Sequence, residues 1–136
     1  MIEDYIAVLE NDATLQALLL AASGNKKIYP LVAPDGETSP WIVYSLTSQG
    51  SSDDVIDQAL VSLAVYAEDY ATASAIVKRI IVLLDLYEGG QSISSTDYRF
   101  LFSKLVPGGT ETREDDTRLY HLGRSFNVQY KRRTGG

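Results

Sequence analysis

The sequence predicts an α+β fold: an antiparallel or mixed β-sheet with one long helix packed on a face, preceded by a short N-terminal helical segment. Within residues 70–87, apolar side chains recur at the three- and four-residue spacing of one helix face. Within residues 120–130, apolar and polar residues alternate, which is typical of a strand with one buried and one wet face. The 136 residues show no internal repeat or linker and predict a single domain over 1–136.

The N-terminal helical segment is expected within residues 2–22, as two short helices or as one bent helix. Ile2, Ile6 and Leu9 share one face, and leucines further along the chain share another. Asp12 lies between the two faces, where its carboxylate can accept hydrogen bonds from the unpaired N–H groups of a first helical turn.

Two strong strands are predicted at residues 41–47 and 60–67, because β-branched and aromatic residues are frequent in both. They are expected to pair as a hairpin across a long polar loop at 48–57. A short extended segment at 28–32 precedes them. The Pro-Asp-Gly sequence at 34–36 then predicts a tight turn with proline at its first central position.

The long helix is expected to begin after Asp69, whose side chain can cap the first turn, and to end at Gly89-Gly90. At about 1.5 Å per residue it would be about 27 Å long, enough to cross several strands. Its apolar face is predicted to pack on the sheet, with Ile76, Val77, Ile80 and Leu84 against Val61, Leu63, Phe126 and Val128.

The second half of the sheet is expected to hold a strand at 98–106 and the alternating strand at 120–130. Pro-Gly-Gly at 107–109 ends the first of them, and a charged loop at 110–118 separates the two. On the last strand the predicted apolar face is interrupted by one charged residue, Arg124.

Composition excludes several function classes. The formal net charge is −6, so the chain's overall field offers no counterion release on a phosphate backbone, and tight duplex binding is not expected. The basic run at 131–133 is interpreted as a solvated chain end. Without cysteine, disulfides, thiolate catalysis and cysteine-ligated metal sites are excluded. No apolar run reaches the roughly 18 residues of a membrane span, so no membrane contact is expected.

Catalytic motifs are not found in the sequence. It has no glycine-rich nucleotide-binding loop, and its single histidine, His121, lies on the polar side of the last predicted strand. Ser125 lies on the same side, but about 13 Å away along an extended strand, too far for a hydrogen bond. We therefore expect no enzymatic activity, no cofactor and no metal site.

Two acidic segments are candidates for contacts with a partner. One holds Glu111, Glu114, Asp115 and Asp116, and the other holds Asp53, Asp54 and Asp57. Such carboxylates could collect a hard cation, but their spacing does not match a calcium-binding loop, and arginines interrupt the first segment. A solvated or partner-facing loop is the favoured interpretation.

Taken in order, these segments resemble the tail-completion proteins of long-tailed bacteriophages, also called tail-terminator or head-to-tail joining proteins. Five stretches carry the resemblance: an opening helix at 12–19, a Lys-Ile-Tyr-Pro stretch at 27–30 followed by Pro34, a Ser-Pro-aromatic stretch at 39–44, a strand and long helix at 59–66 and 68–84, and the last amphipathic strand at 120–130. Residues 48–58 and 91–103 depart from the family pattern, so the family's contacts are not transferred to them.

The resemblance implies a structural protein of the virion neck, made in the host cytoplasm, that forms a ring, commonly a hexamer. That ring caps the tail tube and joins it to the head connector. The implied partners are further copies of the chain, the tail tube protein and a head-completion or connector protein, while DNA only passes through the lumen. The candidate contact residues are Ser48, Gly50, Ser51, Asp53, Asp54, Glu111, Glu114, Asp115 and Asp116.

An electrostatic expectation follows for the ring. Acidic residues on its lumen would repel DNA phosphates and let the DNA slide, within a Debye length of about 8 Å at physiological salt. Two other functions stay open. The chain could be another neck or head-completion protein of the same particle. A small metal-dependent hydrolase would require His121 and convergent carboxylates in one cleft.

Overall fold

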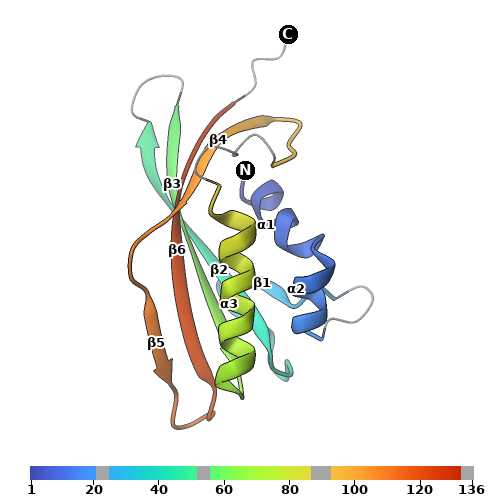
Figure 1. Ribbon diagram of the computed structural model, residues 1–136. Coiled ribbons are helices and arrows are strands. Elements are labelled where there is room, and N and C mark those ends of the chain that lie inside the picture. The colour runs from blue at the N-terminus through green and yellow to red at the C-terminus, as the bar shows by residue number, and fades with distance from the viewer. Residues whose placement is uncertain (21–24, 52–55, 87–92, 133–136) are drawn as a thin grey trace.

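The computed structural model describes residues 1–20, 25–51, 56–86 and 93–132, with the backbone alone at 49–51. The elements are α1 (Ile2–Glu10), α2 (Ala13–Leu18), β1 (Ile28–Pro30), β2 (Trp41–Ser51), β3 (Asp57–Ala67), α3 (Tyr70–Leu84), β4 (Tyr98–Leu105), β5 (Thr110–Arg113) and β6 (Tyr120–Arg132). The strands form one sheet in the order β1-β2-β3-β6-β4, and β5 also pairs with β6. Figure 1 shows α3 lying across the sheet, with α1 and α2 on the same side. The predicted α+β fold is confirmed.

The N-terminal segment forms two helices, and Asp12 marks the break between them. Its carboxylate caps α2 by accepting a hydrogen bond from the backbone N–H of Leu15 at 2.8 Å. The same carboxylate accepts two hydrogen bonds from the Arg79 guanidinium of α3, at 2.9 and 2.7 Å. These bonds to Arg79 lower the pKa of Asp12. One carboxylate therefore both starts α2 and fastens it to α3.

The long helix begins where the sequence predicts. The Asp69 carboxylate accepts a hydrogen bond from the Thr72 backbone N–H at 3.0 Å, so the predicted cap is confirmed. The predicted apolar face is also confirmed, because one buried cluster contains Ile76, Val77, Ile80 and Leu84 together with Val61, Leu63, Phe126 and Val128.

The same helix ends at Leu84, three residues before the predicted end, because the chain turns onto the free edge of β4. Leu86 exchanges two backbone hydrogen bonds with Ser103 of β4, at 2.8 and 3.3 Å. Beside it, the Asp85 carboxylate accepts the Leu105 backbone N–H at 3.1 Å. The predicted end at Tyr87 and Gly89-Gly90 lies outside the described residues.

Half of the predicted loop at 48–57 is strand, namely residues 48–51 and Asp57, which corrects the sequence-based boundaries. β2 continues to Ser51 and β3 already begins at Asp57, so only residues 52–56 join them. The hairpin pairing itself is confirmed as antiparallel. The extension of β3 has a partner, because residues 57–59 lie opposite 128–130 of β6, and β3 pairs with β6 along the whole length of β3. β6 itself runs past the predicted end at Tyr130 to Arg132. Ladder hydrogen bonds therefore hold polar residues in a strand that their intrinsic preference disfavours.

The basic run at 131–133 is only partly a chain end. Lys131 and Arg132 belong to β6 and lie opposite Arg99 and Tyr98 of β4. Arg133 lies outside the described residues. These two positions are therefore part of a paired strand and not a free chain end, while the side chain of Arg132 is exposed to solvent.

The predicted charged loop at 110–118 is also partly wrong. Its first four residues form β5, which pairs antiparallel with β6 from Thr110 opposite Gly123 to Arg113 opposite Tyr120. Because β3 occupies the other edge of β6, β4 and β5 follow one another along the same edge. The Pro-Gly-Gly sequence at 107–109 breaks this edge strand as predicted, but the chain then resumes the same direction.

The break between β4 and β5 requires glycine. Gly109 has φ +153°, a conformation that L side chains rarely adopt, and a Cβ there would lie 2.5 Å from the carbonyl oxygen of Gly123. The backbone at Gly109 passes so close to β6 that no side chain fits between them. Leu105 lies opposite Phe126 and Thr110 opposite Gly123, so the break shifts the register of β5 by two residues relative to that of β4.

One core residue escapes the sequence pattern. Tyr5 of α1 is fully buried, and its hydroxyl lies 2.6 Å from the Ser103 hydroxyl of β4. Burial raises the pKa of Tyr5 above its usual range. The hydrogen bond gives the buried Tyr5 hydroxyl a partner and connects α1 to the edge strand β4. None of the helices in the described part of the chain is long and apolar enough to cross a membrane.

Candidate assembly surfaces

The first predicted contact group lies at one end of the β2–β3 hairpin. Ser48 is an exposed residue of β2, and Gly50 and Ser51 continue the strand. Asp53 and Asp54 lie outside the described residues. Figure 1 shows this end of the hairpin extending away from the three helices. The group therefore occupies an end of the sheet that the helices leave uncovered.

The second predicted group is divided by the structure. Glu111 lies on β5, where its carboxylate accepts the Tyr70 hydroxyl at 2.9 Å and forms an ion pair with Arg124 at 3.7 Å. Asp115 and Asp116 are exposed in the turn between β5 and β6. Glu111 is thus engaged within the protein, while the turn carries the outward-facing acids.

Glu114 closes that turn. Its backbone N–H donates to the Leu119 carbonyl at 2.9 Å, and its carbonyl accepts the Arg118 N–H at 2.8 Å. Its carboxylate accepts the Thr117 hydroxyl at 3.0 Å. The turn is therefore internally hydrogen-bonded.

The two acidic segments lie at opposite ends of the sheet. Asp57, at the hairpin end of β3, is opposite Tyr130, whereas Ala67 at the other end of β3 is opposite Tyr120. Ten residues of strand separate these levels, or about 34 Å at about 3.4 Å per residue. The two segments cannot form one contact site. Which of them faces a lumen or a partner stays a prediction.

His121 belongs to a row of rings on the sheet face away from the helices. Its ring stacks on Tyr66 with centroids 4.8 Å apart, and Tyr66 stacks on Trp41 at 5.5 Å. The three residues lie directly opposite one another on β6, β3 and β2. Ser125, on the same face, shares a hydrogen bond with the Ser62 hydroxyl at 3.0 Å. His121 and Ser125 thus have separate partners, as their distance along the strand predicts.

This open face is shallowly hollowed. A hollow of about 280 Å³ on this face is lined mostly by small and polar residues, and no carboxylate is among the described lining residues. The lining residues are Val43, Ser45, Ser62, Leu63, Ala64, Gly109, Thr110, His121, Gly123, Arg124 and Ser125. In the described part of the chain, no group of three or more His, Cys, Asp or Glu side chains could hold a metal ion.

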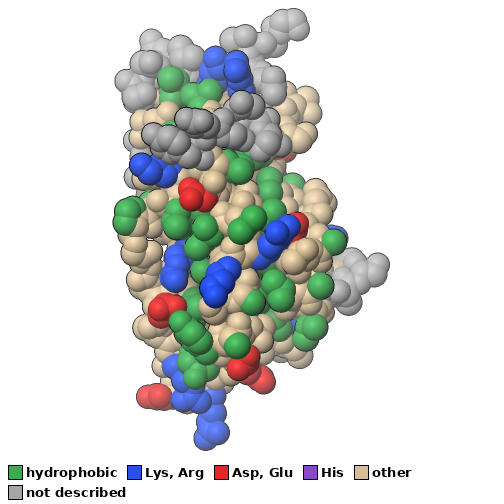
Figure 2. Space-filling model, viewed as in Figure 1, with side chains coloured by type: hydrophobic (Ala, Val, Ile, Leu, Met, Phe, Trp, Pro, Cys, Tyr) green, Lys and Arg blue, Asp and Glu red, His purple; other side chains and the backbone are tan. Residues whose placement is uncertain are grey.

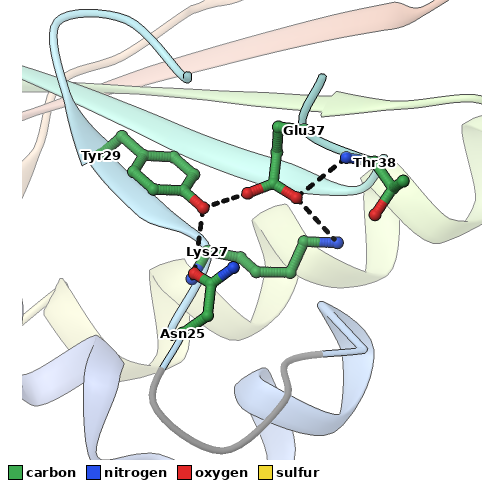
Figure 3. A network of polar contacts seen from close by, with 5 residues as sticks. All are labelled: Asn25, Lys27, Tyr29, Glu37 and Thr38. Carbon is green, nitrogen blue, oxygen red and sulfur yellow. Dashed lines mark hydrogen bonds and ion pairs between the residues drawn. The ribbon is translucent and has the colours of Figure 1, made fainter. Parts of the chain in front are cut away.

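A polar cluster that the sequence analysis missed fixes the segment after β1 (Figure 3). Lys27 is 5% exposed, and its ammonium lies 3.9 Å from the carboxylate of Glu37. That carboxylate also accepts hydrogen bonds from the Tyr29 hydroxyl and from the Thr38 backbone N–H. The hydroxyl of Tyr29 reaches the Asn25 side chain as well, at 3.0 Å.

The contacts within the cluster shift the pKa values of Glu37 and Tyr29 in opposite directions. The hydrogen bond from Tyr29 lowers the pKa of Glu37, and the nearby Lys27 lowers it further. The same bond raises the pKa of Tyr29. The sequence signal for this cluster is weak: Lys27 directly precedes the predicted extended segment at 28–32, Tyr29 lies within it, and Glu37 follows the predicted turn at 34–36.

The predicted turn at 34–36 exists, but with a different register. The Glu37 backbone N–H donates to the Pro34 carbonyl at 3.2 Å, so proline is the first residue of the turn and not its first central residue. Gly36 has φ +82°, which suits glycine at the second central position.

Comparison with known proteins gives a likeness of fold. No protein-family model and no curated protein matches the sequence. A solved chain from the virion of a native gene transfer agent (GTA) particle is similar, with a TM-score of 0.71 at 18% identity over 94% of this chain and 91% of that chain. A second solved chain, at 9% identity, has a TM-score of 0.51 over 100% of this chain and 98% of that chain. At these identities, what is shared is the fold.

Proposed function

We propose that this chain is a structural virion protein of a phage-like particle, where it forms a ring that caps the tail tube and joins it to the head connector. The observation that carries the proposal is the likeness over 94% of the chain to a chain of a gene transfer agent virion. The sequence resemblance to tail-completion proteins supports the same role independently, because it rests on the order of short motifs.

The shape of the molecule suits a joint between two assemblies. The β2–β3 hairpin lies at one end of the sheet and the acidic β5–β6 turn at the other, about 34 Å away along β6. Each end can therefore meet a different neighbour along the particle axis. The hydrophobic core lies under α3, so residues at the two ends of the sheet can contact other proteins without loss of core packing.

The test is removal of the chain from a particle-forming cell. Tails and heads should both form, joined particles should be missing, and addition of the purified chain to that lysate should restore joining. Mass photometry of the purified chain, alone and bound to isolated tails, would count the subunits. Normal joined particles without the chain would overturn the proposal.

A head-completion protein is the second candidate, and the same experiment separates it. A ring that caps the tube also stops its growth, so loss of the cap should give tubes of irregular, excessive length. Loss of a head-completion protein should leave unattached tails of normal length. Electron micrographs of the lysate measure that length directly.

A further inference from the structure

Two apolar side chains are presented to solvent directly after β1. Leu31 is 76% exposed and Val32 is 74% exposed. We call these two residues the knob. Because water-exposed aliphatic side chains gain nothing by folding, their position requires a separate explanation.

The knob is held in an unusual backbone conformation. Leu31 has φ +65°, and the Val32 N–H donates to the Pro30 carbonyl at 2.7 Å, which closes a three-residue turn around Leu31. A leucine rarely adopts this conformation, because its Cβ approaches the backbone closely. Such a turn persists only where its surroundings hold it in place, and it is then a pointer to function.

The polar cluster of Figure 3 supplies that hold. Tyr29 and Lys27 lie just before the knob and Glu37 lies just after it, and all three are joined through the Glu37 carboxylate. The Leu31 N–H also donates to the Tyr44 carbonyl of β2 at 2.9 Å. Both ends of the segment are therefore fixed, and the knob is presented in a preorganised form that binds at a lower entropic cost.

An apolar hollow lies at the other edge of the sheet, between β5 and the start of α3. It has a volume of about 180 Å³, below the roughly 300 Å³ at which ligand pockets begin, so it suits a side chain better than a cofactor. Its lining consists of Tyr70, Glu111, Thr112, Arg113, Tyr120 and Leu122. Figure 2 shows hydrophobic side chains gathered at this corner, with acidic and basic side chains around them.

The walls of the hollow are fixed by internal contacts. The rings of Tyr70 and Tyr120 meet edge to face with centroids 5.6 Å apart. The Tyr70 hydroxyl donates to Glu111, which also pairs with Arg124. Tyr70 is nevertheless 45% exposed, so a large aromatic surface remains open to a partner.

Knob and hollow cannot meet within one chain. Strand β1 is one edge of the sheet, and β5 lies on the other edge, four strand spacings away, or about 19 Å. Their charges are complementary: exposed Asp35 accompanies the knob, and exposed Arg113 borders the hollow. In a pair of copies, the knob of one copy can reach the hollow of the other.

We propose that the knob of one copy inserts into the hollow of the next, with Asp35 beside Arg113. The contact is head-to-tail, so repeating it gives a closed ring if the rotation closes. This inference rests on the proposed function and assigns the subunit interface of its ring.

Cysteine crosslinking gives the sharpest test, because the natural chain has no cysteine. The double variant Val32→Cys with Tyr70→Cys should form disulfides between copies under mild oxidation. It should give a ladder of covalent oligomers up to the ring number, in the isolated chain or in assembled particles. An intrachain bond is excluded by the separation, since bridged Cβ atoms lie about 4 Å apart. Dimers only, or no products in either sample, would overturn the interface.

Association measurements supply a second test with a matched control. Leu31→Gly removes the side chain at a φ that glycine adopts freely, so the fold should persist while self-association weakens by roughly tenfold or more. Leu20→Gly is the control, because Leu20 is also exposed, at 74%, and has φ +55°. It should associate as the natural chain does. Equal weakening by both variants would contradict the proposal.

Charge reversal completes the set. Asp35→Arg and Arg113→Asp should each weaken the ring, and combining them in one chain should restore it. If the natural chain forms rings and joins tails but none of these variants changes the ring, the interface is wrong and the proposed function stands. If particles join without the chain, the proposed function itself fails.

Discussion

Alternate residues of the same strands point to the two faces of the sheet, and the two faces differ in composition: one forms the buried core and the other is open. On the covered face, β3 and β6 contribute fully buried side chains such as Val61 and Phe126 beneath α3. On the open face, the intervening positions carry small polar groups and the stacked rings of Tyr66 and His121. Adjacent residues of a strand therefore point to opposite faces. Single substitutions on the covered face should lower stability, whereas those on the open face should mainly change contacts with other molecules.

The largest effect is expected on the covered face. Phe126→Ala should lower the free energy of unfolding by about 3 to 5 kcal/mol, because it removes a fully buried ring and leaves a cavity. Urea denaturation measures the loss. The neighbouring Asn127→Ala, exposed on the open face, is the control and should change stability by no more than about 0.5 kcal/mol. Similar losses in both would remove the distinction between the faces.

A smaller effect is expected within the helical layer of the covered face. Asp12→Asn keeps a side chain that can cap α2 but removes the charge facing Arg79. Stability at neutral pH should fall by about 1 to 2 kcal/mol, the range for a partly exposed, charge-assisted pair.

The pH dependence of that variant sharpens the prediction. The pKa of Asp12 is lowered in the folded protein, so its contribution is present above the unfolded value of about 4 and is lost as the pH falls through the folded value. The difference between natural and variant chains should therefore shrink from pH 7 to pH 3 in paired denaturation curves. A constant difference would place the effect in packing.

The open face should tolerate change better. His121→Ala removes the ring stacked on Tyr66 and should lower the free energy of unfolding by about 1 kcal/mol or less, in the range of an aromatic pair. Thermal unfolding can measure it. A loss comparable with that of Phe126→Ala would show that the open face also carries the fold.

The smallest effect on stability is expected in the exposed β5–β6 turn. Asp115→Asn combined with Asp116→Asn should change the free energy of unfolding by less than about 0.5 kcal/mol. If this turn lines the DNA passage, the variant particles should release DNA more slowly at low salt and normally at high salt. Unchanged release at low salt would remove the turn from the passage.

Periodic patterns allowed the main elements to be predicted, because periodicity is a local property of the sequence. The helix face around Ile80 and the alternating strand around Phe126 were both readable, and so were the caps at Asp12 and Asp69. Each of these features depends on residues within a few positions of one another.

The missed features depend on distant partners. Residues 110–113 are all polar, two of them charged, and they form a strand because β6 offers them a free edge. Lys27 is buried beside Glu37, which follows the turn at 34–36, and the buried Tyr5 hydroxyl shares a hydrogen bond with the Ser103 hydroxyl. For the predicted contact residues, the sequence indicated which segments are polar but not that they lie at opposite ends of one sheet.

The free edges of the sheet have a consequence for how the chain behaves when it is abundant. On β4, Asp85 and Leu86 occupy backbone groups of the outer edge, β1 stops at Pro30, and β5 has only four residues, with Glu111 and Arg113 among them. Proline, charge and a covering segment are the devices that keep strands from recruiting further strands. We therefore expect a concentrated solution of this chain to resist growth into cross-β fibres.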